Sequence, residues 1–283
     1  MRAALVSLIL LAACAKPLRE PPLTNSDCGE GKGWRYCIYT DAGAKASDTV
    51  LYYLHGGGDS ELMWGTWPVA ADFARRFRDK GLPAPVVVSI SFGKQWLLSE
   101  RGTTVGAGLL ERFVEEAMPA AEAKVGRPRR RLLWGMSMGG FNAAQLLLKR
   151  PALWEAAVLS CPAVTLLSPT ATDKERRDYA ARTGATFEKI DYTLILQKKT
   201  YPTRVAWERH DPMRLAQEAP ELPPTLIECG DADEWGFYEG SRRLSETLAA
   251  QGQRVRLDTV PRGKHCVVDP DQVLGFLLRS AKD

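Results

Sequence analysis

The chain has 283 residues, of which 45% are hydrophobic and 25% charged, a composition typical of an ordinary globular protein with a buried core. Its formal net charge of +4 comes from interspersed Lys, Arg, Asp and Glu residues, so no concentrated basic face is expected and nucleic-acid binding is not supported. No internal period of about 20 to 50 residues is present, which argues against a solenoid or a propeller.

The first residues have the features of an export signal. Arg2 gives a positive start, residues 3–13 are mostly apolar, and small residues precede Cys14. This segment resembles a bacterial lipoprotein signal, which would be removed as residues 1–13 and leave lipid on the thiol and amino group of Cys14. The apolar run is too short to span a bilayer as a stable helix. An ordinary secretory signal with a chance cysteine is the alternative, and both take the protein out of the cytoplasm.

The resemblance to a lipoprotein implies a membrane anchor in the bacterial cell envelope, on a periplasmic or outer-membrane face. Residues 14–27 include Pro17, Pro21 and Pro22 and are expected to form an extended tether. The folded domain is then expected to cover residues 28–283. The sequence leaves its oligomeric state open.

Export also makes disulfides possible. Five cysteines follow the first one, so at least one of them should stay unpaired: Cys28, Cys37, Cys161, Cys229 and Cys266. Cys28 and Cys37 flank a Gly-rich turn and could close a small loop, and Cys229 and Cys266 could meet if their strands are neighbours. None of the spacings resembles a zinc site, and with only three histidines in the chain no metal centre is expected.

Apolar runs of strand length alternate with helical patterns along the chain. The runs, expected to be mostly buried strands, are 34–40, 50–54, 85–92, 131–135, 155–160, 224–229 and 254–260. The helical patterns are 68–80, 107–125, 138–150, 238–252 and about 270–281. This alternation predicts an α/β fold in which helices cover both faces of a mostly parallel, twisted sheet.

The alternation breaks at about 163–223, where the sequence is polar, punctuated by prolines and too long for a plain connection. This stretch has too few apolar residues for an independent core. We therefore expect a cap that lies over the carboxyl edge of the sheet, where ligands and catalytic groups gather in open α/β sheets.

A G-x-S-x-G pentapeptide lies at 135–139, directly after an apolar run and before an Ala/Leu-rich helical pattern. This context is typical of a nucleophile elbow, a sharp strand-to-helix turn that exposes a serine hydroxyl. Gly135 and Gly139 meet the need for small residues at such a turn. Ser137 is therefore the candidate nucleophile.

Serine is a weak nucleophile and needs a base to take its proton. Only one of the three histidines, His265, follows the last predicted strand, where the chain order Ser, acid, His requires the base. His55 is expected to hold its own loop in place. His210 is expected to satisfy backbone groups within the cap.

The acid should follow the strand that precedes the histidine's own strand. The run at 224–229 leads directly into Gly-Asp-Ala-Asp at 230–233. Asp233 fits the G-x-x-D spacing found in many hydrolases whose triad has the chain order Ser, acid, His. It is the preferred acid, with Asp231 as the alternative. The other aspartate is expected to cap the turn or the next helix.

The tetrahedral intermediate of acyl transfer needs N–H donors for its negative oxygen. Met138, the residue after the nucleophile, supplies one donor. A Gly triplet at 56–58 follows a buried strand, and its backbone can approach a substrate closely because glycine has no side chain. The second donor is expected from this triplet, shared between Gly57 and Gly58.

Together these motifs resemble those of α/β-hydrolases, in particular the esterase D-like, or putative esterase, family. Five segments between residues of about 48 and 281 carry the resemblance: LHGGGD at 54–59, GMSMGGFNA at 135–143, SCP at 160–162, ECGDAD at 228–233 and GKH at 263–265. The resemblance implies that Ser137, Asp233 and His265 act as nucleophile, acid and base. It further implies a serine carboxylic-ester hydrolase that forms an acyl-enzyme with a small or medium ester and needs no cofactor.

Other functions remain open on the sequence alone. The same triad could transfer an acyl group or hydrolyse peptides, and a catalytically silent, ligand-binding lipoprotein is an alternative of another class. Four aromatic residues could stack on an aromatic or sugar part of the substrate, with ordinary packing as the equal alternative. They are Trp64, Trp67, Trp96 and Trp235.

Overall fold

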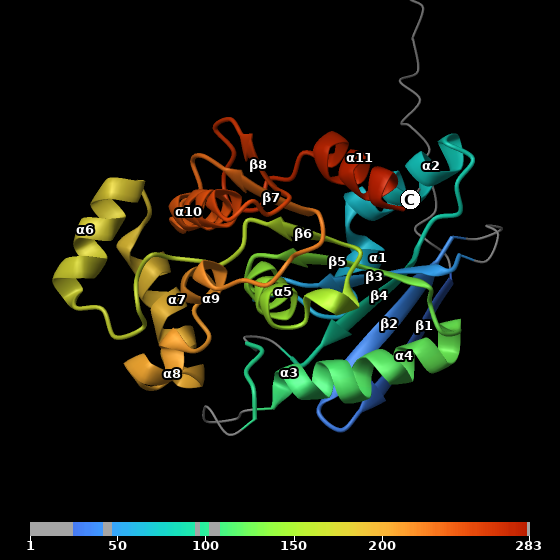
Figure 1. Cartoon of the computed structure of the whole chain (residues 1–283), viewed down its shortest axis with the longest axis horizontal. Helices are drawn as coiled ribbons and strands as arrows, with labels where there is room; N and C mark the ends of the chain where they lie inside the picture. Colours follow the sequence, from blue (N-terminus) through green and yellow to red (C-terminus); the bar gives the residue numbers. More distant parts are fainter. Residues whose placement is uncertain (1–24, 42–46, 94–96, 102–107, 282–283) are drawn as a thin grey trace, which may run out of the picture.

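The computed structural model describes residues 25–41, 47–93, 97–101 and 108–281. Within these residues the chain forms one eight-stranded sheet in the order β1-β2-β4-β3-β5-β6-β7-β8, with helices on both faces (Figure 1). The strands are β1 (Asn25–Gly31), β2 (Trp34–Thr40), β3 (Thr49–Leu54), β4 (Val86–Ser91), β5 (Arg130–Met136), β6 (Ala156–Ser160), β7 (Thr225–Gly230) and β8 (Val255–Val260). The pairs β1–β2 and β2–β4 are antiparallel and all the others parallel, which confirms the mostly parallel sheet.

Each of the helical patterns in the sequence corresponds to helix in the structure. The helices are α1 (Met63–Thr66), α2 (Pro68–Asp79), α3 (Leu109–Arg112), a π-helical turn (Phe113–Ala117), α4 (Met118–Val125), α5 (Met138–Lys149), a 3-10 turn (Pro151–Leu153), α6 (Asp173–Thr183), α7 (Phe187–Thr200), α8 (Arg204–Glu208), α9 (Pro212–Gln217), α10 (Phe237–Ala250) and α11 (Pro270–Ser280). Helices α2 and α11 belong to the core on one face of the sheet, and α5 and α10 to the larger core on the other.

The central strands are apolar because both of their faces are buried. All six residues of β3 are buried, as are all those of β6 and β7. Helix α2 shows the complementary pattern, since its buried residues, Ala70, Phe73, Ala74 and Phe77, recur at the spacing of one helical face.

The strand β1 was not expected from the sequence because its residues are polar and glycine-rich. It lies at the edge of the sheet, where Cys28 faces Cys37 of β2 and the two form a disulfide. The first described strand, β1, includes Asn25, Ser26 and Asp27, which the sequence placed in the tether. The expected signal at 1–13, Cys14 and the tether up to residue 24 lie outside the described residues.

The expected disulfide between Cys229 and Cys266 is wrong. Their strands are neighbours, as assumed, but Cys229 faces Thr259 within the β7–β8 ladder, whereas Cys266 lies in the loop beyond β8. Cys266 bonds instead to Cys161, just after β6, and Cys229 remains a free, buried thiol. Both bonded cysteines have positive φ, so their pairing depends on loop conformation rather than on strand order.

The stretch at 163–223 forms α6 to α9, which lie together at one side of the molecule beside α5 and α10 (Figure 1). Its own apolar cluster is small and centres on Tyr179, Ile190 and Leu194. Tyr201 and Trp207 belong instead to the main core. This segment is thus packed partly on the main core, and residues 163–223 are called the cap below.

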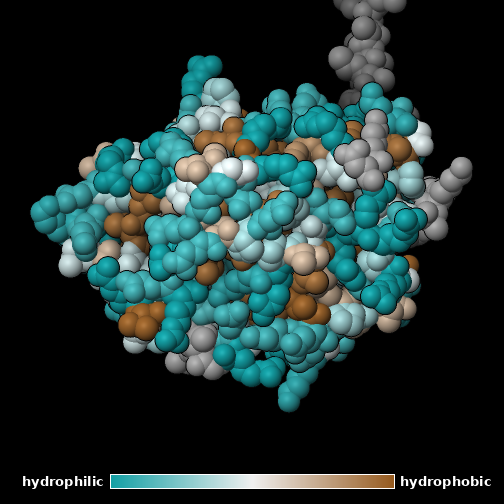
Figure 2. Space-filling view, viewed as in Figure 1, coloured by the Kyte–Doolittle hydropathy of each residue, from teal (hydrophilic) through white to brown (hydrophobic). Residues whose placement is uncertain are grey.

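Among the described residues, few large apolar side chains are exposed. The face seen in Figure 2 is mainly hydrophilic, with apolar residues in separate small patches. The large apolar residues with high exposure are Leu62, Leu166, Tyr192, Ile195, Val205 and Val267. None of the helices in the described part of the chain has both the length and the apolar character needed to cross a membrane.

Candidate active site

Ser137 occupies a sharp turn between β5 and α5. Its backbone has φ 56° and ψ −117°, a conformation that a non-glycine residue rarely adopts. A Cβ atom at Gly135 would lie 2.1 Å from the oxygen of Gly139, and one at Gly139 would lie 2.0 Å from the oxygen of Leu54. Both positions therefore require glycine, and the turn is the nucleophile elbow that the pentapeptide predicts.

Neighbouring strands and loops hold this strained turn in place. The backbone N–H of Ser137 donates to the oxygen of Ser160 at 3.0 Å, at the end of β6. The backbone oxygen of Ser137 accepts from Phe141 N at 3.0 Å and from Ala163 N at 2.9 Å. These bonds to three different segments fix the direction in which the hydroxyl points.

A continuous hydrogen-bond chain links Ser137, His265 and Asp233. Ser137 Oγ lies 2.9 Å from His265 Nε2, and His265 Nδ1 lies 2.8 Å from Asp233 Oδ2. The Asp233 side chain is fully buried, and its other oxygen accepts from Trp235 N at 2.8 Å. The three side chains come from the turns after β5, β7 and β8, so the parallel sheet brings them together at one edge.

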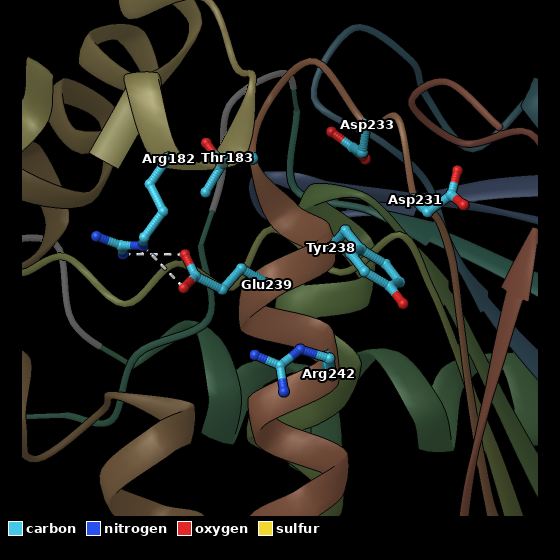
Figure 3. Close-up of a pocket in the computed structure, with 8 residues that line it drawn as sticks. Arg182, Thr183, Asp231, Asp233, Tyr238, Glu239 and Arg242 are labelled. Carbon is cyan, nitrogen blue, oxygen red and sulfur yellow. Dashed lines mark hydrogen bonds and ion pairs between the residues drawn. The ribbon is translucent and has the colours of Figure 1, made fainter. Parts of the chain in front are cut away.

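The alternative acid, Asp231, lies elsewhere on the same loop. It is exposed, and its Oδ1 accepts from the backbone N–H of Arg262 at 2.5 Å. Figure 3 shows that the Asp231 and Asp233 side chains leave the loop in different directions. Asp231 thus links the loop after β7 to the loop after β8. This is the turn-stabilising role that was expected of the aspartate that is not the acid.

Glu234 also supports His265, a contact that the sequence did not reveal. Glu234 Oε2 accepts from the His265 backbone N–H at 3.0 Å, and Oε1 accepts from Lys189 Nζ of the cap at 2.8 Å. Partial burial alone would raise the pKa of Glu234, but these two donors outweigh it and lower the pKa to about 2. Glu234 is therefore a carboxylate at neutral pH and holds the histidine loop against the cap.

The Cys161–Cys266 disulfide holds the same loop from its other side. It joins the residue next to His265 to the end of β6, and Cys266 Sγ lies 3.4 Å from His265 Nε2. The rings of Trp235 and Phe237 pack against the imidazole, each with its centroid 5.4 Å away. The orientation of His265 is therefore set by covalent, polar and aromatic contacts together.

The Gly triplet lies against the elbow. A Cβ atom at Gly56 would be 3.6 Å from Ser137 Cβ, and one at Gly57 would be 3.9 Å from Met138 Sδ. Gly58 is exposed and also borders the site. The backbone of this loop can therefore approach a group that is bound to the serine hydroxyl.

His55 holds the triplet from beneath, as expected. It is fully buried, and its Nδ1 lies 2.7 Å from the oxygen of Gly56 while its Nε2 lies 2.8 Å from Ser91 Oγ. Nδ1 must donate to the carbonyl, so Nε2 accepts from the serine hydroxyl. Burial lowers the pKa of His55, which keeps this ring neutral.

Comparison with known proteins identifies the family of the chain. Residues 90–279 match the family model described as the prolyl oligopeptidase family. The chain belongs to the prolyl oligopeptidase family. Membership places it among the hydrolases with a serine nucleophile. A comparison with curated protein sequences gave no match.

Solved structures show that this member of the prolyl oligopeptidase family has the α/β-hydrolase fold. A ferulic acid esterase is 17% identical, with a TM-score of 0.65 over 90% of this chain and 97% of that one. A brefeldin A esterase, described as a bacterial homologue of human hormone sensitive lipase, is 18% identical. Its TM-score is 0.65 over 98% of this chain and 81% of that one. An S-formylglutathione hydrolase from Agrobacterium tumefaciens is 20% identical, with a TM-score of 0.56 over 91% of this chain and 94% of that one.

His210 of this family member is separate from the triad. It is buried, stacks on Tyr201 with ring centroids 4.9 Å apart, and has Nδ1 3.2 Å from Lys149 Nζ. Burial and the Lys149 charge lower its pKa to about 4. Its backbone oxygen accepts from Gln145 of α5, so His210 fastens the cap to the main core.

A cavity of about 640 Å³ opens beside Ser137 and His265 and is lined by the Gly triplet, α5 and α7. Of the four tryptophans considered in the sequence, Trp235 lines this cavity. Trp64 is fully buried in the core on the opposite side of the sheet, and Trp67 packs against that core, so neither is at the mouth. Trp96 lies outside the described residues.

Proposed function

We propose that this protein is a serine esterase that forms an acyl-enzyme on Ser137. One observation carries the proposal: the unbroken chain from Ser137 Oγ to His265 to the buried carboxylate of Asp233, with both links under 3 Å. Such a chain gives the serine a base and gives the base a counter-charge, which are the requirements of nucleophilic catalysis by serine.

The proposed reaction starts when His265 Nε2 takes the proton of Ser137 Oγ as this oxygen attacks the ester carbonyl. The backbone N–H groups of Met138 and of Gly57 or Gly58 then stabilise the negative oxygen, and His265 returns the proton to the departing alcohol. In the second half, His265 activates a water molecule that releases the acid. The Asp233 carboxylate stabilises the imidazolium in both halves.

The structural neighbours support an ester as the substrate, since those described above include two enzymes named as esterases. The mostly apolar lining of the cavity supports the same view, because it suits the hydrocarbon part of a small or medium ester. The motifs that resemble the esterase D-like family support the finer assignment. Peptide hydrolysis is the second candidate, favoured by the family to which the chain belongs.

A matched pair of substrates separates these two activities. We expect higher kcat/KM for 4-nitrophenyl butyrate than for butyryl-4-nitroanilide or a prolyl 4-nitroanilide. Faster turnover of the prolyl amide would identify a peptidase instead. A transferase would be recognised if an added alcohol captured more of the acyl group than water did.

Labelling with a fluorophosphonate tests the enzyme class itself. The folded protein should react at Ser137, and Ser137→Ala should lose both the label and about three orders of magnitude of ester hydrolysis. A folded wild-type protein that neither reacts with the probe nor turns over esters would be the catalytically silent binding protein.

We also propose that the protein is exported and anchored by lipid at Cys14. The apolar run at 3–13 and the small residues before Cys14 support this proposal. Cys14→Ser should move the protein from the membrane fraction to the soluble fraction. Unchanged fractionation would contradict the lipid anchor.

A further inference from the structure

Two cysteines and the triad histidine meet beside the cavity. The sulfur atoms of Cys161 and Cys266 and a ring nitrogen of His265 all lie within 4.8 Å of one another, and Cys266 Sγ lies 3.4 Å from His265 Nε2. In the described part of the chain, this is the only group of three Cys, His, Asp or Glu side chains close enough to share one metal ion. The sequence does not reveal the group, because the two cysteines have a sequence separation of 105.

The two sulfur atoms are bonded to each other in the structure. A disulfide sulfur is a weak metal ligand, whereas a thiolate is a strong one. A dithiol reductant would supply two electrons and two protons, turn the disulfide into two thiols and itself become a disulfide. The Cα atoms of Cys161 and Cys266 are 5.3 Å apart, so rotation of the side chains can bring the sulfurs to the separation of about 3.8 Å that two tetrahedral zinc ligands need.

His265 already has the hydrogen bonding of a metal ligand. Its Nδ1 lies 2.8 Å from the Asp233 carboxylate and must donate to it, which leaves a lone pair on Nε2. Histidines that bind a metal commonly donate their other ring N–H to a carboxylate in this way. The Nε2 lone pair faces Ser137 Oγ at 2.9 Å. It can therefore accept the serine proton or bind a metal ion, but not both at once.

The three side chains offer a known set of zinc ligands. Two thiolates and one imidazole occupy three positions of a tetrahedral Zn²⁺ ion and leave the fourth for water or for Ser137 Oγ. Cys161 is buried, but His265 and Cys266 both line the cavity. An ion can therefore reach the group from the cavity.

We propose that reduction of the Cys161–Cys266 disulfide creates a binding site for Zn²⁺ at the triad. Two metal–sulfur bonds and one bond to His265 Nε2 form, and both thiol protons pass to solvent. The bound ion takes the lone pair that would accept the Ser137 proton, so the reduced and metal-loaded protein is inactive as a serine hydrolase. The oxidised protein does not bind the ion, because its sulfurs are not thiolates.

Co²⁺ is the probe for the site, because thiolate ligands give it a charge-transfer band in the near ultraviolet. The test uses Cys28→Ala/Cys37→Ala protein, which has no second disulfide to reduce. It is reduced with a phosphine, since dithiols bind metals themselves, and the phosphine is removed without air. The reduced protein should then bind one Co²⁺ per chain with the thiolate band, and Zn²⁺ should displace it. The oxidised protein should show no such band.

Inhibition by Zn²⁺ is measured on the same protein. Zn²⁺ at about ten times its Kd should lower ester hydrolysis and fluorophosphonate labelling of the reduced protein by about tenfold, and a chelator should restore both. Cys161→Ala/Cys266→Ala in the same background is the matched control, because it also lacks the disulfide but has no thiolates at the site. Zn²⁺ at that concentration should leave its own rate unchanged. The oxidised protein is a second control that needs no substitution at the site.

A reduced protein without the thiolate band would overturn the proposal, as would a disulfide that the phosphine cannot reduce in the folded protein. Zn²⁺ inhibition of equal strength in the oxidised protein or in Cys161→Ala/Cys266→Ala would overturn it as well. The Co²⁺ spectrum does not depend on ester turnover. It therefore decides whether the metal site exists even if the proposed esterase function fails.

Discussion

Removal of the Cys161–Cys266 disulfide should weaken both the fold and the catalysis. The bond closes a segment with a sequence separation of 105, whereas Cys28–Cys37 closes one of 9. Loop-closure entropy in the unfolded chain then predicts a loss of about 4.7 kcal/mol of unfolding free energy for the first and about 2.6 kcal/mol for the second. For a domain of this size the melting temperature should fall by about 10 °C and about 5 °C.

Two double variants are compared, each with both cysteines of one pair replaced by alanine. The substitutions are the same, but one disulfide lies beside His265 and the other lies far from it. Cys266 adjoins His265, so its release loosens the loop that carries the base, and kcat should fall by about tenfold to a hundredfold. The Cys28–Cys37 bond lies at the far edge of the sheet, and its loss should leave kcat unchanged.

Urea unfolding and steady-state ester kinetics on both variants measure these effects. Equal losses of unfolding free energy would refute the loop-closure argument. A Cys161–Cys266 variant that is less stable but has wild-type kcat at 20 °C would show that the disulfide does not position His265.

Three further predictions follow from other contacts. Asp233→Asn should lower kcat for ester hydrolysis by about four orders of magnitude, whereas Asp231→Asn should leave most of it; the opposite result would reassign the acid. Gly139→Ala should cost about 3 kcal/mol or more in urea unfolding, because its Cβ would collide with the oxygen of Leu54. Burial raises the pKa of Glu228 from 4.5 to about 8, so the folded state binds this proton more tightly than the unfolded state. Unfolding free energy should therefore decrease as the pH rises from about 4.5 to about 8, and Glu228→Gln should flatten the slope that thermal melts show in this range.

The parts of the site that the sequence predicted are those with a local signature. The elbow at Ser137 is encoded by an apolar strand, two glycines and a helical pattern within a few residues. The order of strands in a parallel sheet predicted the positions of His265 and of the loop that carries Asp231 and Asp233, and the G-x-x-D spacing favoured Asp233. The structure brings Ser137, Asp233 and His265 together at the sheet edge.

The parts that the sequence did not predict depend on distant segments meeting in loops. Cys266 and Cys161 meet in two loops where both residues have positive φ, a conformation that cysteine spacing does not reveal. The contact of Glu234 with Lys189 joins the loop after β7 to the cap, two segments that lie far apart in the sequence. Trp64 lies in the core on the face of the sheet opposite the cavity. Its place in the sequence, shortly after the Gly triplet, wrongly suggested a position at the mouth of the site.

The ion pairs that join the cap to the loop after β7 and to the start of α10 have a consequence for changes in substrate range. Arg182 of α6 forms a two-point ion pair with Glu239, drawn as dashed lines in Figure 3, and Lys189 of α7 binds Glu234, the residue beside Asp233. A chimaera that received a foreign cap alone would lose these partners and weaken the contact of Glu234 with the backbone of His265. A cap should therefore be exchanged together with residues 231–239. A chimaera made in this way should acquire the substrate range of the donor protein without losing its activity.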